Sequence, residues 1–544
     1  MIDWGLQVTE RKSTGPKAVV AALLASGVLA AGFASPAFAD ATTPVRGGTL
    51  ITTLGADPPG LNPVLSTALG DSITGCMLYS ALLSVTKTGE PKPYLAKNFT
   101  VSPDGLTYTL ELNKAEWSDG KPLTSEDVKY SLTEVNAKYG SHYSAVARSL
   151  EGIETPALDK VVFKLKHPTA YLPLSLACGG GGAILPAHIF RGTNVLQNPA
   201  NTQTPVGSGP FMLKEWKRGD HIRMVRNPKY FEPDKPYLDD IVLRIMPQAG
   251  SRTRALIAGE LDYLFFYYLP ASDHTQIESD PKLKLATSTM PPVLDIMSFN
   301  VARKPLEDKR VRQALMMATD RDYLVKNAWS GKGKVGTMPF TTELPWTVNP
   351  DVDYRKLYPF DYAKANALLD EAGYPRGANG IRFKLKMVYA TEEAELALAA
   401  VAAKAMWRNV GVDMEVFGED RAAQLQKVFK DHDFDVTLNG CGTFFDPALG
   451  LERLYIKATI GNVYGNASSF INPEIETLLH DAGSATKQAD RTKLYQVAQA
   501  KIADELPVVT LREKGNFNAA SKKVHWDETL TDQWRNWADF WMEK

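Results

Sequence analysis

The chain has 544 residues, of which 44% are hydrophobic and 23% are charged, proportions that are ordinary for a globular protein. The formal net charge of −1 shows no basic excess, which argues against a nucleic-acid-binding protein, and no long apolar run follows residue 40, which excludes a polytopic membrane protein. A chain of this length exceeds what one hydrophobic core usually supports, so we expect two or more lobes.

The first 39 residues have the order of a secretory signal peptide. Basic residues within 11–17 precede an uncharged apolar stretch at 18–31, and residues 37–39 form a small-x-small cleavage site. We expect cleavage there, a mature chain from Asp40, and a location in the periplasm. The alternative is an uncleaved membrane anchor, but the apolar part is shorter than the roughly 20 residues of a spanning helix. No cysteine lies at the cleavage site, so we expect no lipid anchor.

The first half of the mature chain is rich in predicted strands. Alternating or β-branched residues predict strands at 48–53, 107–112, 161–165 and 241–245. Thr124 and Asp127 form a capping box, which predicts a helix from there through Asn136. Four consecutive glycines at 179–182 permit close approach of another backbone segment.

The second half alternates helices with strands. After a predicted helix at 305–318, Asp361 caps a helix that ends at Gly373. Strands are then predicted at 383–388, 412–417 and 434–438, with helices at 393–409 and 421–430 between them. This β-α-β-α-β order is typical of an α/β lobe.

The end of the chain turns back toward strands. Helices are predicted from Pro473 and Ala489, and a strand at 507–511. The tail then carries Trp526, Trp534, Trp537 and Trp541, which we expect to dock on an earlier lobe. Because the α/β lobe lies between β-richer ends, we expect a discontinuous first domain, with two crossing segments that act as a hinge.

No catalytic or metal-binding constellation emerges from the sequence. The eight His are scattered without paired-ligand spacing. The three cysteines (Cys76, Cys178 and Cys441) form no C-x-x-C, and each is predicted to be a buried structural residue. In an oxidising compartment an odd count leaves at least one thiol unpaired or intermolecular. We therefore expect no enzyme, no cofactor and no metal. An exported hydrolase remains the alternative, because a catalytic triad is spatial rather than sequential.

Several segments together resemble one known family. Residues 79–132 carry Y-S-A-L-L-S-V-T at their start and W-S-D-G-K-P-L-T-S-E-D-V-K-Y-S-L at their end. Further matching segments lie at 205–211, 226–230, 305–315 and 362–374. The whole mature chain resembles, in order, the peptide/nickel family of solute-binding proteins of ABC importers, which includes the oligopeptide- and dipeptide-binding proteins.

The resemblance implies an α/β, two-lobed periplasmic binding protein clamp (type II, large peptide-binding class) with an extra subdomain in its first lobe. The implied divisions are a signal peptide at 1–39, lobe I at 40–293 with its inserted subdomain at about 84–200, lobe II at 294–509, and a return to lobe I at 510–544. It implies capture of peptides or peptide-like solutes and delivery to an inner-membrane ABC permease with its ATPase subunits. We expect a monomer that binds no nucleic acid. A non-peptide solute, such as an opine, an oligosaccharide or a sugar-phosphate conjugate, is the alternative.

The family's amine anchor is altered in this chain. Peptide-binding members hold the ligand's amino group with an Asp three residues after a Trp, and the matching stretch here begins at Gly440. Cys441 stands at the Trp position and Phe444 at the Asp position, with Gly442 between them and Phe445 after them. Asp446 replaces the anchor if the loop is shorter; a capping or turn role is the alternative. Phe444 and Phe445 offer rings for stacking on a ligand.

Other ligand-binding residues are expected on both lobes. The resemblance places Thr67 and Ala68 in a stretch that offers backbone hydrogen bonds to a bound peptide, and it places Tyr143 at the opposite edge. Arg421 opens a predicted helix near the family's pocket, where a guanidinium holds a carboxylate or phosphate. The alternative is a surface Arg421 paired with Glu419 or Asp420.

Overall fold

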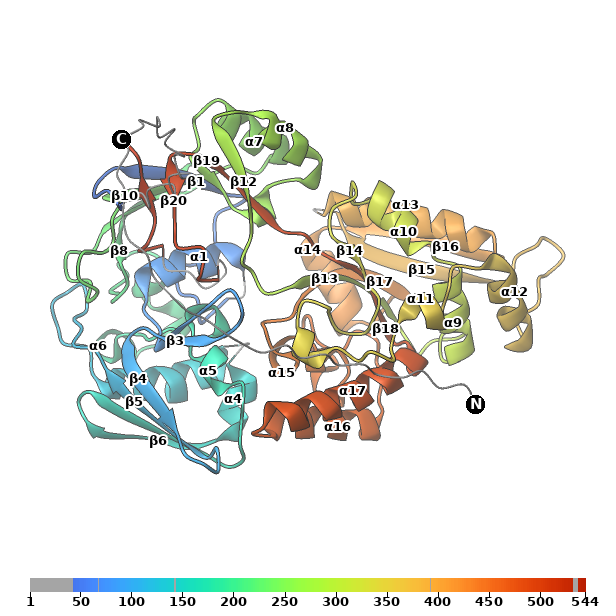
Figure 1. Ribbon diagram of the computed structural model, residues 1–544, viewed down its shortest axis with the longest axis horizontal. Coiled ribbons are helices and arrows are strands. Elements are labelled where there is room, and N and C mark those ends of the chain that lie inside the picture. The colour runs from blue at the N-terminus through green and yellow to red at the C-terminus, as the bar shows by residue number, and fades with distance from the viewer. Residues whose placement is uncertain (1–42, 67, 141–142, 392, 532–536) are drawn as a thin grey trace, which may run out of the picture. The chain divides into compact units, whose positions relative to one another are not determined.

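The computed structural model describes residues 43–66, 68–140, 143–391, 393–531 and 537–544 (Figure 1). The predicted signal peptide, Thr67 and Trp534 lie outside these residues. Across the described ranges, no helix is both long enough and apolar enough to cross a membrane.

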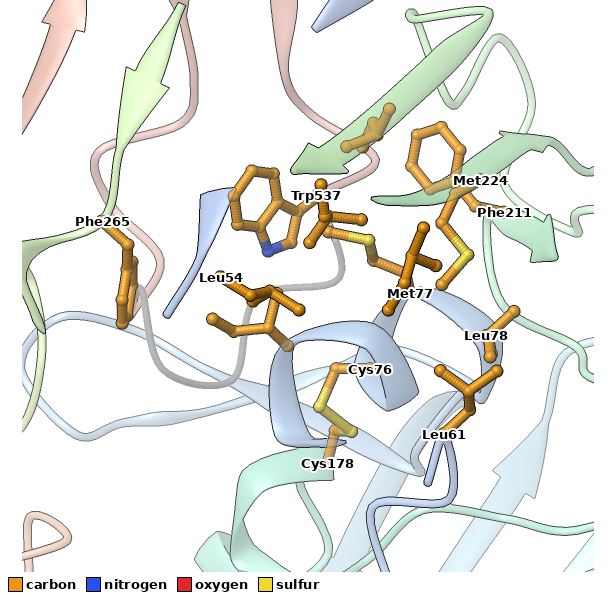
Figure 2. Packing of buried hydrophobic residues seen from close by; sticks show 14 of the residues in the cluster. Leu54, Leu61, Cys76, Met77, Leu78, Cys178, Phe211, Met224, Phe265 and Trp537 are labelled. Carbon is orange, nitrogen blue, oxygen red and sulfur yellow. A yellow bond between two sulfur atoms is a disulfide. The ribbon is translucent and has the colours of Figure 1, made fainter. Parts of the chain in front are cut away.

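The first lobe is organised around a four-stranded sheet in the order β1-β10-β9-β8. Its strands are β1 (Thr49–Leu54), β10 (Asp240–Ile245), β9 (His221–Arg226) and β8 (Phe211–Lys217). Helix α1 (Leu69–Leu78) packs against this sheet in a hydrophobic core that also takes in Trp537 from the C-terminal tail (Figure 2). Tyr263 contacts the rings of both Trp526 and Trp537, so the expected docking of the tail is confirmed for these two residues.

A second sheet of the first lobe has the order β4-β5-β7-β6. Its strands are β4 (Ala96–Val101), β5 (Thr107–Leu112), β7 (Lys160–Leu165) and β6 (Leu150–Ala157). Every second residue of β5 is buried, which confirms the predicted half-buried strand. The predicted capping box starts α2 (Ser125–Tyr130), and the helix continues as a π-helical turn through Asn136.

Shorter elements complete the first lobe. They are β2 (Leu83–Val85), β3 (Pro91–Pro93), α3 (Ala137–Tyr139), α4 (Ser144–Ser149), α5 (Leu172–Ser175), α6 (Ala187–Phe190), α7 (Ala249–Ile257), β11 (Tyr263–Leu264), α8 (His274–Ser279) and β12 (Leu283–Thr287). The glycine run packs against the backbone of α5: a Cβ on Gly180 would lie 2.3 Å from the carbonyl oxygen of Leu174. The predicted close approach is therefore confirmed.

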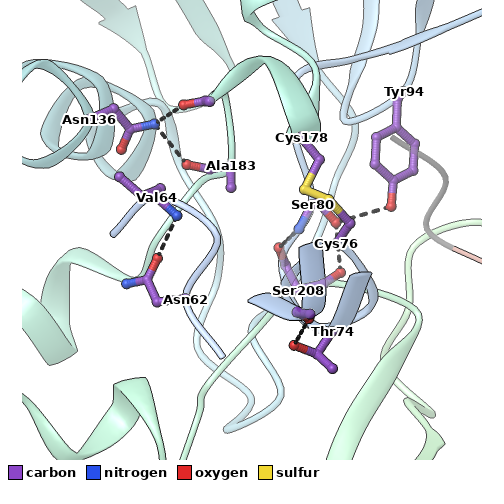
Figure 3. The surroundings of a disulfide bond; sticks show 12 residues. Asn62, Val64, Thr74, Cys76, Ser80, Tyr94, Asn136, Cys178, Ala183 and Ser208 are labelled. Carbon is purple, nitrogen blue, oxygen red and sulfur yellow. Dashed lines mark hydrogen bonds between the residues drawn. A yellow bond between two sulfur atoms is a disulfide. The ribbon is translucent and has the colours of Figure 1, made fainter. Parts of the chain in front are cut away.

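A disulfide joins α1 to the glycine run. Cys76 and Cys178, 102 residues apart in sequence, are bonded, and Cys441 is a buried free thiol. Figure 3 shows polar side chains around this disulfide that bond to backbone carbonyls: the Ser80 hydroxyl donates to Ser208 O, and the Asn136 amide donates to Ala183 O. The disulfide itself belongs to the hydrophobic core of the first lobe, and these polar hydrogen bonds lie around it.

The second lobe contains a six-stranded sheet in the order β14-β18-β13-β17-β15-β16. Its strands are β14 (Lys334–Val335), β18 (Val508–Glu513), β13 (Val293–Phe299), β17 (Val436–Gly442), β15 (Phe383–Ala390) and β16 (Val412–Glu419). β15 runs parallel to both β16 and β17, as the predicted α/β order requires. β17 begins at Val436, two residues later than predicted, because pairing with Phe299 and Met387 starts there.

Helices cover both faces of this sheet. One face packs against α9 (Lys309–Met317), α12 (Tyr362–Glu371) and α13 (Ala394–Arg408); the other packs against α16 (Pro473–Ser484) and α17 (Gln488–Glu505), which lie side by side in Figure 1. The α9 helix begins at Lys309 rather than at 305, because Asp308 caps it by accepting from the Arg310 N–H. The remaining helices are α10 (Arg321–Asn327), α11 (Tyr354–Leu357), α14 (Arg421–Leu425), which continues as a π-helical turn, and α15 (Pro447–Gly450).

Two segments cross between the sheets. Residues 288–292 connect β12 to β13, and residues 514–516 connect β18 to β19 (Phe517–Ser521), which pairs with β11 and β12. β18 pairs with β13 through Glu513, so its strand continues beyond residue 510. The short β20 (Val524–His525) and β21 (Trp541–Met542) then pair with each other.

Candidate functional site

Five strands of the six-stranded sheet begin or end at the same edge, which we call the carboxyl edge. The parallel strands β15, β16 and β17 end there, at Ala390, Glu419 and Gly442. β13 is antiparallel to β17 and begins at this edge, while β18 is antiparallel to β13 and ends there. Both crossing segments therefore leave the sheet at the edge where ligands of open α/β sheets bind.

A network of charged side chains lies along this carboxyl edge. Glu393, just after β15, accepts from the Arg421 guanidinium at 2.6 Å and lies 3.5 Å from the Lys514 ammonium. Lys514 also lies 3.0 Å from Asp295, which accepts from Arg512 at 2.6 Å. The network joins three strand ends and the second crossing segment.

The buried part of this network favours fully ionised groups. Asp295 is 1% exposed, so burial alone would raise the pKa of its carboxyl; the cations Arg512 and Lys514 outweigh that cost and lower its pKa. Burial likewise opposes the charge of Lys514, but Asp295 and Glu393 raise the pKa of its ammonium above the ordinary value. Each of these buried charges thus depends on its neighbours.

Arg421 faces this network rather than its neighbours in sequence. Its partner is Glu393 across the edge, whereas Glu419 pairs with Lys427 and Asp420 accepts from the Ala423 N–H. The Arg421 side chain is 21% exposed, so part of the guanidinium remains accessible. A partly exposed guanidinium at the end of a strand suits recognition of a planar anion.

The turn after β17 contains the residues expected to replace the amine anchor. Phe444 and Phe445 both adopt left-handed backbone angles, with φ of 54° and 62°. Asp446 is 4% exposed; it accepts from the Ala448 N–H as the cap of α15 and pairs with the Arg491 guanidinium at 2.8 Å. The structure thus gives Asp446 the capping role that was the alternative, together with a buried ion pair.

Cys441 and Gly442 end β17 next to a small cavity. Cys441 is 2% exposed, burial raises the pKa of its thiol, and the Arg453 guanidinium lies 3.5 Å from its sulfur. A cavity of about 10 Å³, the size of one water molecule, is lined by Cys441, Arg453, Ser298 and Asn439, among others. Gly442 pairs with Val293 at the carboxyl edge.

The first-lobe candidates Ala68 and Tyr143 are held by contacts within their own lobe. Ala68 occupies the N-cap position of α1, where its N–H donates to the Ser66 hydroxyl and its carbonyl accepts from the Ser72 N–H. Tyr143 is 0% exposed in the core of the second first-lobe sheet. Contact between Tyr143 and a ligand would require this core to open. Thr67 lies outside the described residues.

The two lobes touch through side chains near the Phe444–Phe445 turn and through α16. Phe445 packs with Val85, Leu174 and Ala177 of the first lobe. Near α16, the His480 ring lies 5.7 Å from the ring of His167, and a Cβ on Gly483 would lie 3.6 Å from the Tyr171 ring. The carboxyl edge therefore faces the region where the lobes meet.

Sequence reasoning missed Glu393, Lys514 and Asp295. Each lies at or beside the end of a strand at the carboxyl edge, and the parallel β-α-β order was visible in the sequence. Reading the charged residues that follow each predicted strand would have found Glu393, as it found Arg421. Across the described residues, no three His, Cys, Asp or Glu side chains gather as a metal site requires.

Glu452 is a partly buried carboxylate at the lobe contact. Burial first, and then the neighbouring Asp446 carboxylate, raise its pKa from 4.5 to about 7, while Arg148 of the first lobe opposes the shift. The folded protein therefore holds this proton more tightly than the unfolded chain. Its stabilising effect is complete below pH 4.5 and is lost as the pH rises through 7.

We expect Glu452→Gln to flatten the decline of the melting temperature between about pH 4.5 and pH 7, because the amide does not ionise. Thermal unfolding across this range measures the effect. Glu474→Gln is the matched control, since the Glu474 side chain is 65% exposed. Equal pH slopes for the wild type and Glu452→Gln would contradict the assignment.

Comparisons with known proteins agree with this arrangement. Residues 90–462 match the family described as bacterial extracellular solute-binding proteins, family 5 Middle. The oligopeptide-binding protein AppA of Bacillus subtilis is 28% identical over 508 residues, 90% of each chain, and the glutathione-binding protein GsiB of Pectobacterium atrosepticum is 30% identical over 513 residues, 92% of this chain and 94% of that one.

A solved structure shows the same fold. The oligopeptide-binding protein AppA from Bacillus subtilis, in complex with a nonapeptide, superposes with a TM-score of 0.80 at 26% identity, covering 92% of this chain and all (100%) of that one. The predicted two-lobed α/β clamp is confirmed by this likeness. The predicted family is confirmed as well, since the match spans more than half of the chain. The chain belongs to family 5 of the bacterial extracellular solute-binding proteins.

Proposed function

We propose that this protein is the periplasmic solute-binding component of an ABC importer, and that it captures peptides or peptide-like solutes between its lobes. The observation that carries the proposal is the charged carboxyl edge of the second-lobe sheet, from which both crossing segments depart. A solute bound there touches the elements that move when the lobes rotate. The relatives named for oligopeptide and glutathione binding support this class of solute.

The rest of the arrangement follows from this role. We propose cleavage after residue 39, a freely diffusing monomer, and delivery to an inner-membrane permease with its ATPase subunits. The functional divisions that we propose are lobe I at 40–293 with its subdomain at about 84–200, lobe II from 294 through the end of β18 at Glu513, and a return to lobe I after it, later than the expected start at 510. Binding and release need no reacting group, so the protein acts without catalysis.

Within the site, Arg421 holds a carboxylate or phosphate of the solute, steadied by Glu393. Gly442 and the Phe444 ring flank the solute at the end of β17, and Ala68 and Thr67 contribute on the first lobe. Asp446 shapes this wall through its bond to Arg491 rather than by touching the solute. Cys441 and Tyr143, both buried, support the walls from behind.

Two carboxylates near the end of the second-lobe sheet, Asp446 as the expected amine anchor and Glu393 at the carboxyl edge, already face cations. Asp446 pairs with Arg491, and Glu393 pairs with Arg421. Transferring either to a ligand ammonium would break an existing ion pair, so a free amino terminus adds little affinity. This observation also favours the second candidate function, capture of a non-peptide solute such as an opine or a sugar-phosphate conjugate.

We expect a short peptide that raises the melting temperature to do so equally well after N-terminal acetylation. The two affinities should agree within about threefold, a difference of less than about 1 kcal/mol, since about 1.4 kcal/mol corresponds to tenfold. Thermal shift screening of peptide, opine and sugar-phosphate libraries identifies the solute, and titration calorimetry compares the acetylated pair. Loss of binding on acetylation would contradict the expectation that a free amino terminus adds little affinity. Release of a cleaved product during the screen would instead support the exported hydrolase.

A further inference from the structure

The Phe444–Phe445 turn is a strained segment at the end of β17. Two consecutive non-glycine residues with φ of 54° and 62° occupy a region that costs energy for side chains with a Cβ. Both ends of the turn are fixed within or beside the second lobe. The Thr443 N–H donates to the carbonyl of Pro292 at 3.0 Å, and Asp446 is held by Arg491 at 2.8 Å.

This fixed turn presents Phe445 to the other lobe. Phe445 is only 6% exposed, and the other buried members of its apolar cluster, Val85, Leu174 and Ala177, belong to the first lobe. Gly89 completes this receiving surface: a Cβ there would lie 2.8 Å from the Cβ of Phe445. A ring buried by another lobe is exposed when that lobe moves away.

The receiving surface is tied to the first crossing segment. The Thr289 hydroxyl donates to Leu530 O at 2.7 Å, and the Thr531 hydroxyl donates to Thr289 O at 2.8 Å. The same C-terminal segment reaches β2, because the Thr531 N–H donates to Val85 O at 3.0 Å. The crossing segment is therefore bonded to both partners of the contact, to Val85 through Thr531 and to the Phe turn through Pro292.

We propose that Phe445 is a latch that holds the two lobes closed independently of the solute. Because the turn belongs rigidly to one lobe and its apolar receiving surface to the other, rotation at the crossing segments must separate them. Dispersion contacts weaken steeply over less than 1 Å of separation. The strain of the turn is maintained because it places this ring against the receiving surface.

The latch sets affinity for every solute by the same factor. When the closed arrangement is less populated, the apparent affinity for any solute falls in proportion to the closed fraction. A residue that touches the solute, such as Arg421, affects some solutes more than others. This distinguishes the latch from a wall of the site, and only this consequence rests on the proposed function.

The test measures the distance between lobes in the solute-free full-length protein. Spin labels are placed on cysteines introduced at Leu158 and Val401, which are 72% and 60% exposed on the first and second lobes. The native disulfide and buried Cys441 leave these two sites as the reactive thiols. Pulsed electron–electron double resonance then gives the distribution of distances between the two labels, and with it the ratio of closed (short) to open (long) arrangements.

We expect Phe445→Ala to lower the closed-to-open ratio about tenfold, which corresponds to about 1.4 kcal/mol and places Phe445 among the minority of interface residues whose truncation has a large effect. Phe470→Ala is the matched control: Phe470 is also 6% exposed but lies in a core within the second lobe. It lowers stability and leaves the ratio unchanged. Leu174→Ala reproduces the Phe445→Ala shift from the first lobe, and the double variant shifts little further.

Unchanged distances in Phe445→Ala overturn the latch, as does an equal shift in Phe470→Ala. These outcomes need no solute, so they stand apart from failure of the proposed function. Once a solute is identified, a loss of affinity confined to one of several solutes would also contradict the latch.

Discussion

Replacing Arg512 with Met is expected to lower the free energy of unfolding by about 3–5 kcal/mol, the range found when one partner of a buried ion pair is removed. The Arg512 side chain is 4% exposed and bonds Asp295 at 2.6 Å and Glu395 at 2.8 Å. Methionine keeps only the apolar inner part of the side chain: it lacks the guanidinium that lies over the Trp329 ring, and it leaves the buried Asp295 with Lys514 as its remaining cation. Guanidinium unfolding followed by circular dichroism measures the loss.

Arg355→Met is the matched control for this prediction. Arg355 pairs with Asp322 at 2.9 Å, but its side chain is 53% exposed, so the pair contributes about 0–1 kcal/mol. If Arg512→Met costs no more than Arg355→Met, the network at the carboxyl edge is not a structural requirement of the second lobe.

Removing the Cys76–Cys178 disulfide by the double change to Ser is expected to cost about 2–5 kcal/mol. The bond closes a segment of 102 residues that includes the second first-lobe sheet, so its loss frees a long stretch of the unfolded chain. Thermal unfolding of the oxidised wild type and the Cys76→Ser/Cys178→Ser variant measures the difference.

A reducing agent provides the control within the same experiment. It lowers the melting temperature of the wild type toward that of the double variant and leaves the variant unchanged, because Cys441 is a buried free thiol. A wild type that is indifferent to complete reduction would contradict the stabilising role of this bond.

Local signals predicted the individual elements well. The alternation of residues 107–112, the Asp361 cap and the Thr124–Asp127 capping box each act within a few residues, so the sequence displays them directly. The start of α9 was misplaced because Pro305 suggested a first turn, whereas Asp308 supplies the capping oxygen.

The site was less predictable because its partners are distant in sequence. Asp295 and Arg512 are 217 residues apart, and Arg421 meets Glu393 rather than the acidic residues beside it. Three cysteines allow three pairings, and only the packing of α1 against the glycine run selects Cys76 with Cys178. The role of Asp446 depends on Arg491, 45 residues further along the chain.

Native mass spectrometry of the protein purified from a bacterial periplasm tests most directly whether the carboxyl edge holds a solute. The account predicts a non-covalent adduct on the wild type that is lost on denaturation, with fragments that identify a peptide or a peptide-like anion. It also predicts an occupancy at least about tenfold lower on Arg421→Ala, the loss of one charge-assisted bidentate contact of roughly 1.5–3 kcal/mol. An adduct with equal occupancy on both proteins would place the solute elsewhere and contradict the account.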